Sequence, residues 1–272
     1  MDSRLRGNDA MQPVLETRDL TIRFGGHVAV NDVSCSFAPG SLTAIVGPNG
    51  AGKTTYFNLI SGQLPASAGA VLIDGVEVTK LGAARRAKLG IGRAFQLTNL
   101  FPNLTVHENV RLAVQAHAGG GANILSRWNS RRDWIEGADR FIEAANLADK
   151  RDTPAVALPH GDKRKLEVAI MMALEPHVFM FDEPTAGMSV DDVPVILDLI
   201  KKLKGEGDKT ILLVEHKMDV VKSLADRIVV LHNGRLVADG EPAEVIGSAV
   251  VQEAYLGVAA SPRAGPSEAP HG

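Results

Sequence analysis

The sequence predicts an α/β fold: a mixed sheet at the core, an antiparallel β subdomain at the N-terminal end, and an inserted α-helical subdomain. Three observations predict this fold. Strand-like alternation fills 14–37. A glycine-rich loop joins an apolar run at 42–46 to an amphipathic run at 55–64. Helical periodicity replaces the strand pattern within 97–176.

The same patterns divide the chain into segments. The expected parts are a disordered lead at 1–12, a folded domain at 13–257 with its core at 13–96 and 177–257 and a helical arm at about 97–176, and a disordered tail at 258–272. The lead mixes charge with Gly and Asn, and the tail is rich in Pro, Ala, Ser and Gly. Such compositions cannot bury enough apolar surface to fold.

Composition excludes several classes of function. The net charge is −3 and aromatic residues make up 4%, so no basic face indicates a nucleic-acid partner. The single cysteine, Cys35, excludes an internal disulfide and a cysteine metal site, and we expect a small buried thiol in a reducing, cytoplasmic compartment. No apolar run approaches the roughly 20 residues that span a bilayer. A membrane role therefore requires other subunits.

Two strands are expected at 14–24 and 27–37, joined by a turn at Gly25-Gly26 and followed by the apolar run at 42–46. Phe24 ends the first strand close to the glycine-rich loop. An exposed aromatic residue there would stack on adenine, whereas the alternative is an ordinary core aromatic.

The glycine-rich loop fits the phosphate-binding pattern of P-loop NTPases. Its residues are Gly47, Pro48, Asn49, Gly50, Ala51, Gly52, Lys53 and Thr54, with Thr55 next in the following helix. Glycines let the backbone N–H groups surround a triphosphate, and the helix N-terminus adds partial positive charge. We expect Lys53 to reach the β- and γ-phosphates of ATP and Thr54 to bind Mg²⁺. The alternative is a glycine-rich turn beside an unrelated lysine.

Beyond this loop, a strand at 70–73 is expected to turn at Asp74-Gly75, and a strand at 91–95 ends at Gln96, for which a polar cap is one interpretation. Thr105 and Glu108 form a capping box for a helix that reaches about residue 117. Two more helices are expected within the arm, at 132–147 and 162–174.

A buried strand at 178–183 closes with two carboxylates, Asp182 and Glu183. Adjacent strand residues point to opposite sides, so these acids have different tasks. One can hold the Mg²⁺ shell and the next can polarise an attacking water. The alternative is a solvated strand end.

After this strand, Ser189 is expected to cap a helix whose apolar positions include Val195, Leu199 and Leu203. A strand at 210–214 leads to His216, which either contacts a γ-phosphate or is a surface residue. A hairpin at 227–238 turns at Asn233-Gly234, and a last helical stretch covers 242–256.

Taken in this order, the residues over about 14–257 resemble the ATP-binding subunit of an ABC transporter. The resemblance implies that Phe24 stacks on adenine, that residues 47–54 form the Walker A loop, and that Gln96 is the Q-loop residue that contacts the metal. It implies that Asp182 is the Walker B metal ligand. Glu183 is then the catalytic glutamate, with His216 and Lys53 as further catalytic residues.

Several short stretches of the sequence are similar to those of the ATPases that energise branched-chain amino-acid importers. The matching stretches are Phe24-Gly25-Gly26, Ala29-Val30-Asn31-Asp32-Val33, Asn103-Leu104-Thr105-Val106, Glu108-Asn109-Val110, Pro184-Thr185-Ala186-Gly187-Met188-Ser189 and Ala254-Tyr255-Leu256-Gly257. This resemblance implies two transmembrane permease subunits, an extracytoplasmic substrate-binding protein, and a peripheral position on the cytoplasmic face of the cell membrane.

One motif departs from the family. Its signature, Leu-Ser-Gly-Gly-Gln in much of the family, binds the γ-phosphate held by the opposite subunit; here the positions are occupied by Leu158, Pro159, His160, Gly161 and Asp162. Pro159 lacks the hydroxyl and the N–H, and Asp162 adds negative charge, so weaker binding is expected. This asymmetry suggests pairing with a second, different ATPase subunit.

Three alternatives stay open at this stage. The same ATPase class could serve another cargo, such as urea, other amino acids or exported lipopolysaccharide. A soluble ABC protein acting on ribosomes or DNA is disfavoured by the single phosphate loop and the absence of a basic excess. A non-hydrolysing regulatory module is disfavoured by Glu183.

Overall fold

The computed structural model describes residues 12–94, 100–119, 132–249 and 251. Its strands are β1 Leu15–Phe24, β2 His27–Phe37, β3 Leu42–Val46, β4 Ala68–Ile73, β5 Val76–Glu77, β6 Ile91–Ala94, β7 Val178–Asp182, β8 Thr210–Val214, β9 Arg227–His232 and β10 Arg235–Gly240. Its helices are α1 Lys53–Ser61, α2 Ala83–Lys88, α3 Val106–His117, α4 Arg132–Ala144, α5 His160–Ala173, α6 Val193–Gly205, α7 Met218–Leu224 and α8 Pro242–Gly247, with short 3₁₀ turns at Ala148–Lys150 and Ala155–Ala157.

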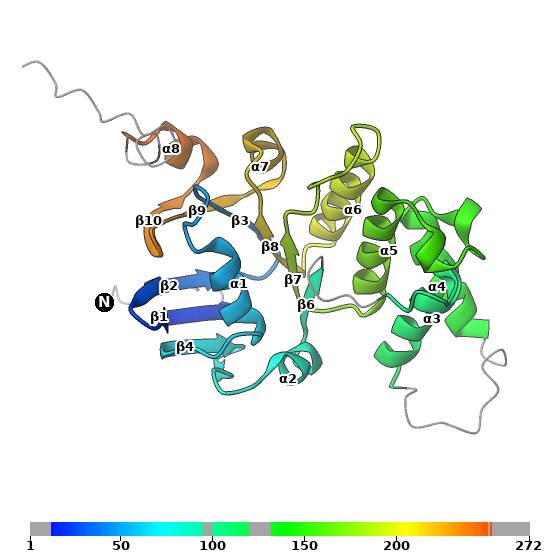
Figure 1. The fold of residues 1–272 in the computed structure, drawn as a ribbon, viewed down its shortest axis with the longest axis horizontal. Coiled ribbons are helices and arrows are strands. Elements are labelled where there is room, and N and C mark those ends of the chain that lie inside the picture. Colours follow the sequence, from blue (N-terminus) through cyan, green and yellow to red (C-terminus); the bar gives the residue numbers. More distant parts are fainter. Residues whose placement is uncertain (1–11, 95–99, 120–131, 250, 252–272) are drawn as a thin grey trace, which may run out of the picture.

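Two sheets form the framework, and both confirm the predicted α/β fold. A four-stranded sheet has the order β2-β1-β4-β5 and is antiparallel throughout. A six-stranded sheet has the order β10-β9-β3-β8-β7-β6, parallel except for the β9-β10 hairpin. Figure 1 shows α1 between the two sheets and α6 and α7 on the other side of the larger sheet.

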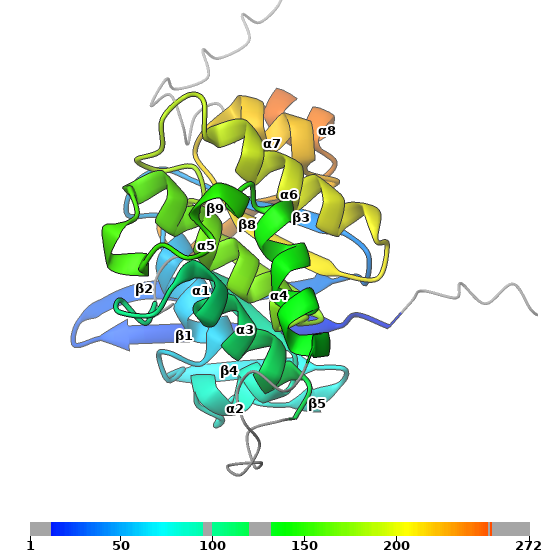
Figure 2. The ribbon, with the colours of Figure 1, turned by 90° about the vertical axis from the view of Figure 1, so that its right-hand side faces the viewer.

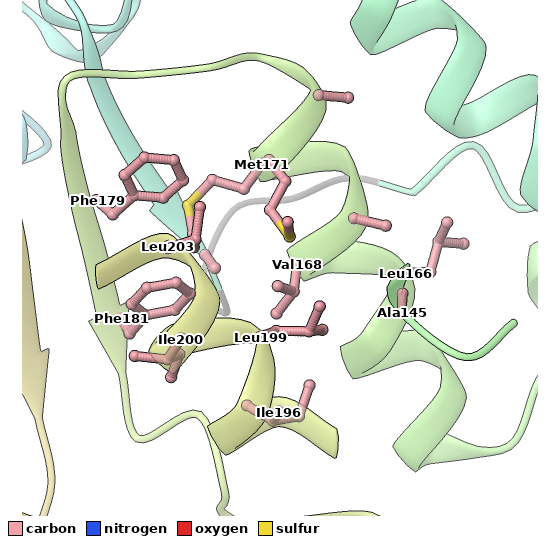
Figure 3. Packing of buried hydrophobic residues seen from close by; sticks show 14 of the residues in the cluster. Ala145, Leu166, Val168, Met171, Phe179, Phe181, Ile196, Leu199, Ile200 and Leu203 are labelled. Carbon is pink, nitrogen blue, oxygen red and sulfur yellow. The ribbon is translucent and has the colours of Figure 1, made fainter. Parts of the chain in front are cut away.

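The packing of strand β7 explains why its first four residues are all apolar. Met180 packs with α1 and the small sheet, whereas Phe179 and Phe181 face α5 and α6. Figure 3 shows these two rings against Met171 of α5 and Leu203 of α6. A parallel strand with both faces covered carries apolar residues throughout. This packing on both faces fixes β7 in place, and Asp182 lies at its carboxyl end.

Helices α3, α4 and α5 pack on one another beyond the six-stranded sheet, in the stretch expected to be helical. Figure 2 shows them gathered on one side of the molecule. The capping box is confirmed: the N–H of Glu108 donates to Thr105 Oγ1 over 3.1 Å, and the N–H of Thr105 donates to Glu108 Oε2 over 2.9 Å. Among the described residues, none of the helices has the length and apolar character needed to cross a bilayer.

Several boundaries differ from the predictions. Helix α6 begins at Val193 with Asp192 as its N-cap residue, three residues after Ser189. Ser189 caps the turn just before the helix: its hydroxyl accepts the N–H of Asp192 over 3.3 Å and donates to Asp192 Oδ2 over 2.7 Å. Helix α5 begins at His160, two residues before the predicted start, because Pro159 holds extended backbone and needs no hydrogen-bond partner for an N–H group. Helix α2 was not predicted.

The other ends are shorter than expected. Helix α4 stops at Ala144, and Asn146 then has a φ of +55°, which ends the helical pattern. Helix α8 ends at Gly247, but Ala249 and Val251 are helical again after Ser248, and the rest of the predicted helix lies outside the described residues.

Candidate functional site

The glycine-rich loop connects β3 to α1 as the sequence predicts, and its backbone requires glycine at defined points. A Cβ atom at Gly52 would lie 2.5 Å from the carbonyl oxygen of Ala29, and φ there is +97°. At Gly50 φ is +80°, but no atom lies within 4 Å of where Cβ would be. Only glycine adopts the conformation of Gly52 without displacing the neighbouring backbone.

Lys53 is the first residue of α1, and its side chain folds back over the loop. Nζ donates to the carbonyl oxygens of Gly47 and Pro48 over 2.7 Å and 3.0 Å. Burial lowers the pKa of Lys53, whereas the charges of Glu183 and Asp182 raise it. These contacts hold a cation against the inner surface of the loop, where a phosphate chain would need it.

A cavity of about 430 Å³ opens beside this loop. Residues 49–55 form most of its wall, and His27, Ala29 and Glu183 complete it. The wall therefore combines backbone from the loop, the first residues of α1 and one carboxylate from the end of β7. Such a site suits an anionic ligand, because a helix N-terminus and a lysine converge on it.

Asp182 is buried and ion-paired at the edge of the sheet. Its Oδ2 atom accepts a hydrogen bond from the Arg93 guanidinium of β6 over 2.8 Å. Its other carboxylate oxygen accepts no hydrogen bond within the part of the chain that the structure describes. Asp182 is thus a fixed carboxylate with one oxygen available to a ligand.

Glu183 follows directly but has a different environment. Its φ is +50°, its N–H donates to the Val214 carbonyl over 2.9 Å, and its side chain lines the cavity. His216 Nδ1 lies 3.9 Å from Glu183 Oε1, and both side chains are about half exposed. The structure therefore brings the predicted residues Glu183 and His216 together. Glu183 and Asp182 have different environments, as expected for adjacent residues at the end of a strand.

Phe24 ends β1 and is 49% exposed, so the interpretation as an ordinary core aromatic is wrong. It pairs across the β1-β2 hairpin with His27, which lines the cavity. Gln96 lies outside the described residues, as does the predicted motif at 254–257.

The oxygen donors present suit a magnesium ion. Thr54 offers a hydroxyl in the cavity wall, and Asp182 offers a carboxylate oxygen. Among the described residues, no cluster of three or more His, Cys, Asp or Glu side chains forms a self-contained metal site. Mg²⁺ commonly takes one or two protein oxygens and completes its shell with phosphate and water, which matches this donor set.

Comparison with known proteins decides the family. The sequence profile described as "ABC transporter" matches residues 30–186. The chain belongs to the ABC transporter family. A high-affinity branched-chain amino acid transport ATP-binding protein, BraF of Pseudomonas aeruginosa, is 37% identical over 91% of this chain and 99% of its own length. LivG of Escherichia coli K12, with the same description, is 36% identical over 91% of this chain and 99% of its own length.

Solved structures of the ABC family agree. A nucleotide-free ATP-binding cassette from an ABC transporter superposes with a TM-score of 0.76 at 28% identity, covering 90% of this chain and 99% of that one. A cassette in its ADP conformation gives a TM-score of 0.77 at 29% identity, covering 91% of this chain and all of that one.

The segment predicted to be the variant ABC signature lies at the start of α5, where Leu158 is buried and Pro159 and His160 are exposed. A Cβ atom at Gly161 would lie 2.6 Å from Asp192 Oδ2, so the helix start is packed closely against the segment before α6. This contact links the signature to the loop that follows Glu183.

The charge of Asp162 is compensated within the chain, which corrects the expected repulsion of a phosphate. Asp162 is buried, its Oδ1 atom lies 3.1 Å from Lys165 Nζ, and its Oδ2 atom is ion-paired with Lys150. Lys165 Nζ also lies 2.5 Å from Asp192 Oδ1. The weaker phosphate binding expected of this segment therefore depends on Pro159, and not on an unpaired negative charge at Asp162.

Two important residues were missed by sequence reasoning. Arg93 lies inside the strand predicted at 91–95, between apolar neighbours, and a cation that becomes buried requires a partner, so the sequence held a signal for it. Glu215 is fully buried after β8; its Oε1 atom lies 2.5 Å from the Thr185 hydroxyl and its Oε2 atom accepts the N–H of His216 over 2.9 Å. Glu215 thereby fixes the backbone that carries His216.

Proposed function

We propose that this chain energises the uptake of branched-chain or related amino acids from the cytoplasmic face of the cell membrane. The chain is an ATP-binding and ATP-hydrolysing subunit of an ABC transporter. The proposed cargo rests on the 36–37% sequence identity to BraF and LivG over 91% of this chain. The relatives are matched over 99% of their lengths, so the likeness is not confined to the nucleotide site.

In the proposed cycle, Lys53, the N–H groups of residues 49–54 and the α1 N-terminus bind the phosphates of ATP, and Phe24 stacks on the adenine. Thr54 and Asp182, together with Gln96, would hold Mg²⁺, which when bound neutralises phosphate charge. Glu183 orients the attacking water and accepts its proton, and His216 steadies the γ-phosphate. Positioning and charge stabilisation supply most of the rate enhancement.

We further propose how the chain is organised within a transporter. The core at 13–96 and 177–257 holds nucleotide, and the arm at about 97–176 transmits closure to two permease subunits. An extracytoplasmic binding protein acts indirectly through these permeases. Pro159 supports a second, different ATPase subunit as partner, because it offers neither a hydroxyl nor an N–H to a γ-phosphate in the opposite site.

The hydrolytic assignment is tested with Glu183→Gln. The variant should bind ATP as the wild type does and lose most turnover, about 100-fold or more, because a catalytic base contributes roughly that factor. Glu175→Gln is a matched control, since Glu175 also has a positive φ, of +46°, but lies after α5. Unchanged turnover in Glu183→Gln would contradict the assignment.

The cargo is tested by uptake of radiolabelled leucine, isoleucine and valine in cells that lack this chain, with and without a plasmid that restores it. Restored uptake of these amino acids, and not of urea, supports the proposal. Purification from solubilised membranes should recover two polytopic permeases and a different ATPase. Recovery of ribosomal or DNA-repair proteins without permeases would overturn it.

A further inference from the structure

We infer that Arg93 is a positioning residue for the magnesium site, because it fixes Asp182 and helix α1 in the relative placement that metal binding by Thr54 and Asp182 requires. The inference rests on the proposed function, since it concerns the metal proposed for that site. Arg93 is not among the described residues that line the cavity, and the inferred effect on the metal runs through its contacts with Asp182 and α1.

One end of the connection is the pair between Arg93 and Asp182. Strands β6 and β7 are parallel neighbours, and the Arg93 guanidinium lies 2.8 Å from Asp182 Oδ2. The exposed fractions of the two side chains are 6% and 4%. The hydrogen bond to Arg93 fixes the orientation of the buried carboxylate, and removing Arg93 would leave its charge uncompensated.

The other end of the connection is helix α1. A second guanidinium nitrogen donates to Asn58 Oδ1 over 2.6 Å and to Ser61 Oγ over 3.1 Å. The guanidinium also lies 5.6 Å from the centroid of the Phe57 ring. Helix α1 begins at Lys53 and carries Thr54 in its first turn. Arg93 therefore ties the helix of one proposed metal ligand to the strand of the other.

The contact with Asp182 leaves a place for the metal. Arg93 occupies Oδ2 only, and Oδ1 accepts no hydrogen bond from any residue within the described ranges. Arg93 thus orients the carboxylate and does not compete for the remaining oxygen. A planar guanidinium can bridge two acceptors on one side and a carboxylate on the other, which a lysine ammonium cannot do in the same geometry.

The test measures the magnesium dependence of nucleotide binding, followed by fluorescence of mant-ATP. Arg93→Gln should require about 10- to 100-fold more MgCl₂ for half-maximal binding, the cost typical of losing a partner that orients a metal ligand. Affinity for mant-ATP in EDTA should stay unchanged, because the loop and Lys53 are intact. Arg93→Lys should show a smaller shift in the same direction.

Arg86→Lys is the matched control. Arg86 is also buried and also contacts α1, where it donates to the carbonyls of Leu59 and Ile60 over 2.7 Å each. Arg86→Lys should lower the free energy of unfolding and leave the magnesium requirement for mant-ATP binding at the wild-type value. A merely structural role for Arg93 predicts the same behaviour for both arginines.

The outcomes separate the two proposals. A wild-type magnesium requirement in Arg93→Gln, or an equal shift in Arg86→Lys, would overturn the inference and leave the proposed function standing. If Arg93→Gln does not fold, the same comparison is decided by Arg93→Lys, which keeps the charge. Wild-type chain that binds no mant-ATP with or without MgCl₂ would instead overturn the proposed function, and the inference with it.

Discussion

Asp162 and Lys165 form a buried ion pair at the start of α5, with 3.1 Å between Asp162 Oδ1 and Lys165 Nζ. Lys165 also holds Asp192, and the pKa of Asp192 is lowered chiefly by that contact. Asp162, at the position predicted to replace the signature glutamine, therefore joins α5 to the segment before α6 through Lys165.

Restoring the common signature residue should consequently destabilise the protein. Asp162→Gln leaves Lys165 and Lys150 with one carboxylate fewer, and we expect the free energy of unfolding to fall by about 1–3 kcal/mol. Urea unfolding measures this change. Asp191→Gln, at an exposed acid before the same helix α6, is the control and should stay within about 0.5 kcal/mol of wild type. Equal effects of the two substitutions would show that the ion pair contributes nothing.

Phe24 should contribute to nucleotide affinity through stacking. Phe24→Ala is expected to weaken mant-ATP binding by about 5- to 160-fold, the range that about one to three kcal/mol of base stacking provides. Phe24→Trp should retain affinity. Phe101→Ala removes another exposed phenylalanine, 55% exposed, from the loop before α3 and serves as control. Identical affinities in wild type and Phe24→Ala would place adenine elsewhere.

Two glycines of the phosphate loop should respond differently to alanine. Gly50→Ala meets only backbone strain, because open space surrounds its Cβ position, and we expect a cost of about 1–2 kcal/mol. Gly52→Ala adds a clash with the Ala29 carbonyl, 2.5 Å from the new Cβ, and should cost clearly more. Unfolding free energies of the two variants test this order, and the reverse order would contradict the loop geometry.

His107 should make stability depend on pH. Burial, followed by the charge of Arg151, lowers the pKa of His107 from its usual value of 6.5. Between the lowered pKa of the folded state and 6.5, the unfolded chain binds more protons than the folded one. Stability should therefore fall as pH drops below about 6.5, by at most about 1.4 kcal/mol per pH unit for this residue.

The pH effect of His107 is measured by urea unfolding between about pH 5 and 7.5. His107→Gln should reduce the acid-side loss of stability. His117→Gln, which removes an exposed imidazole from the same helix, is measured alongside as the control. A profile unchanged by His107→Gln would contradict a depressed pKa at this site.

Much of this protein is determined by its sequence locally. The phosphate loop, the Thr105 capping box, the Asp74-Gly75 turn and the β9-β10 hairpin each depend on short-range backbone chemistry that a few adjacent residues specify. The strand order and the pairing of distant side chains were decided only by the tertiary structure. Arg93 meets Asp182, and Lys165 meets Asp192, because packing of the sheet and of α5 brings segments distant in sequence together. Local patterns report which residues prefer to be buried, but the partner of a buried charge is set by the whole fold.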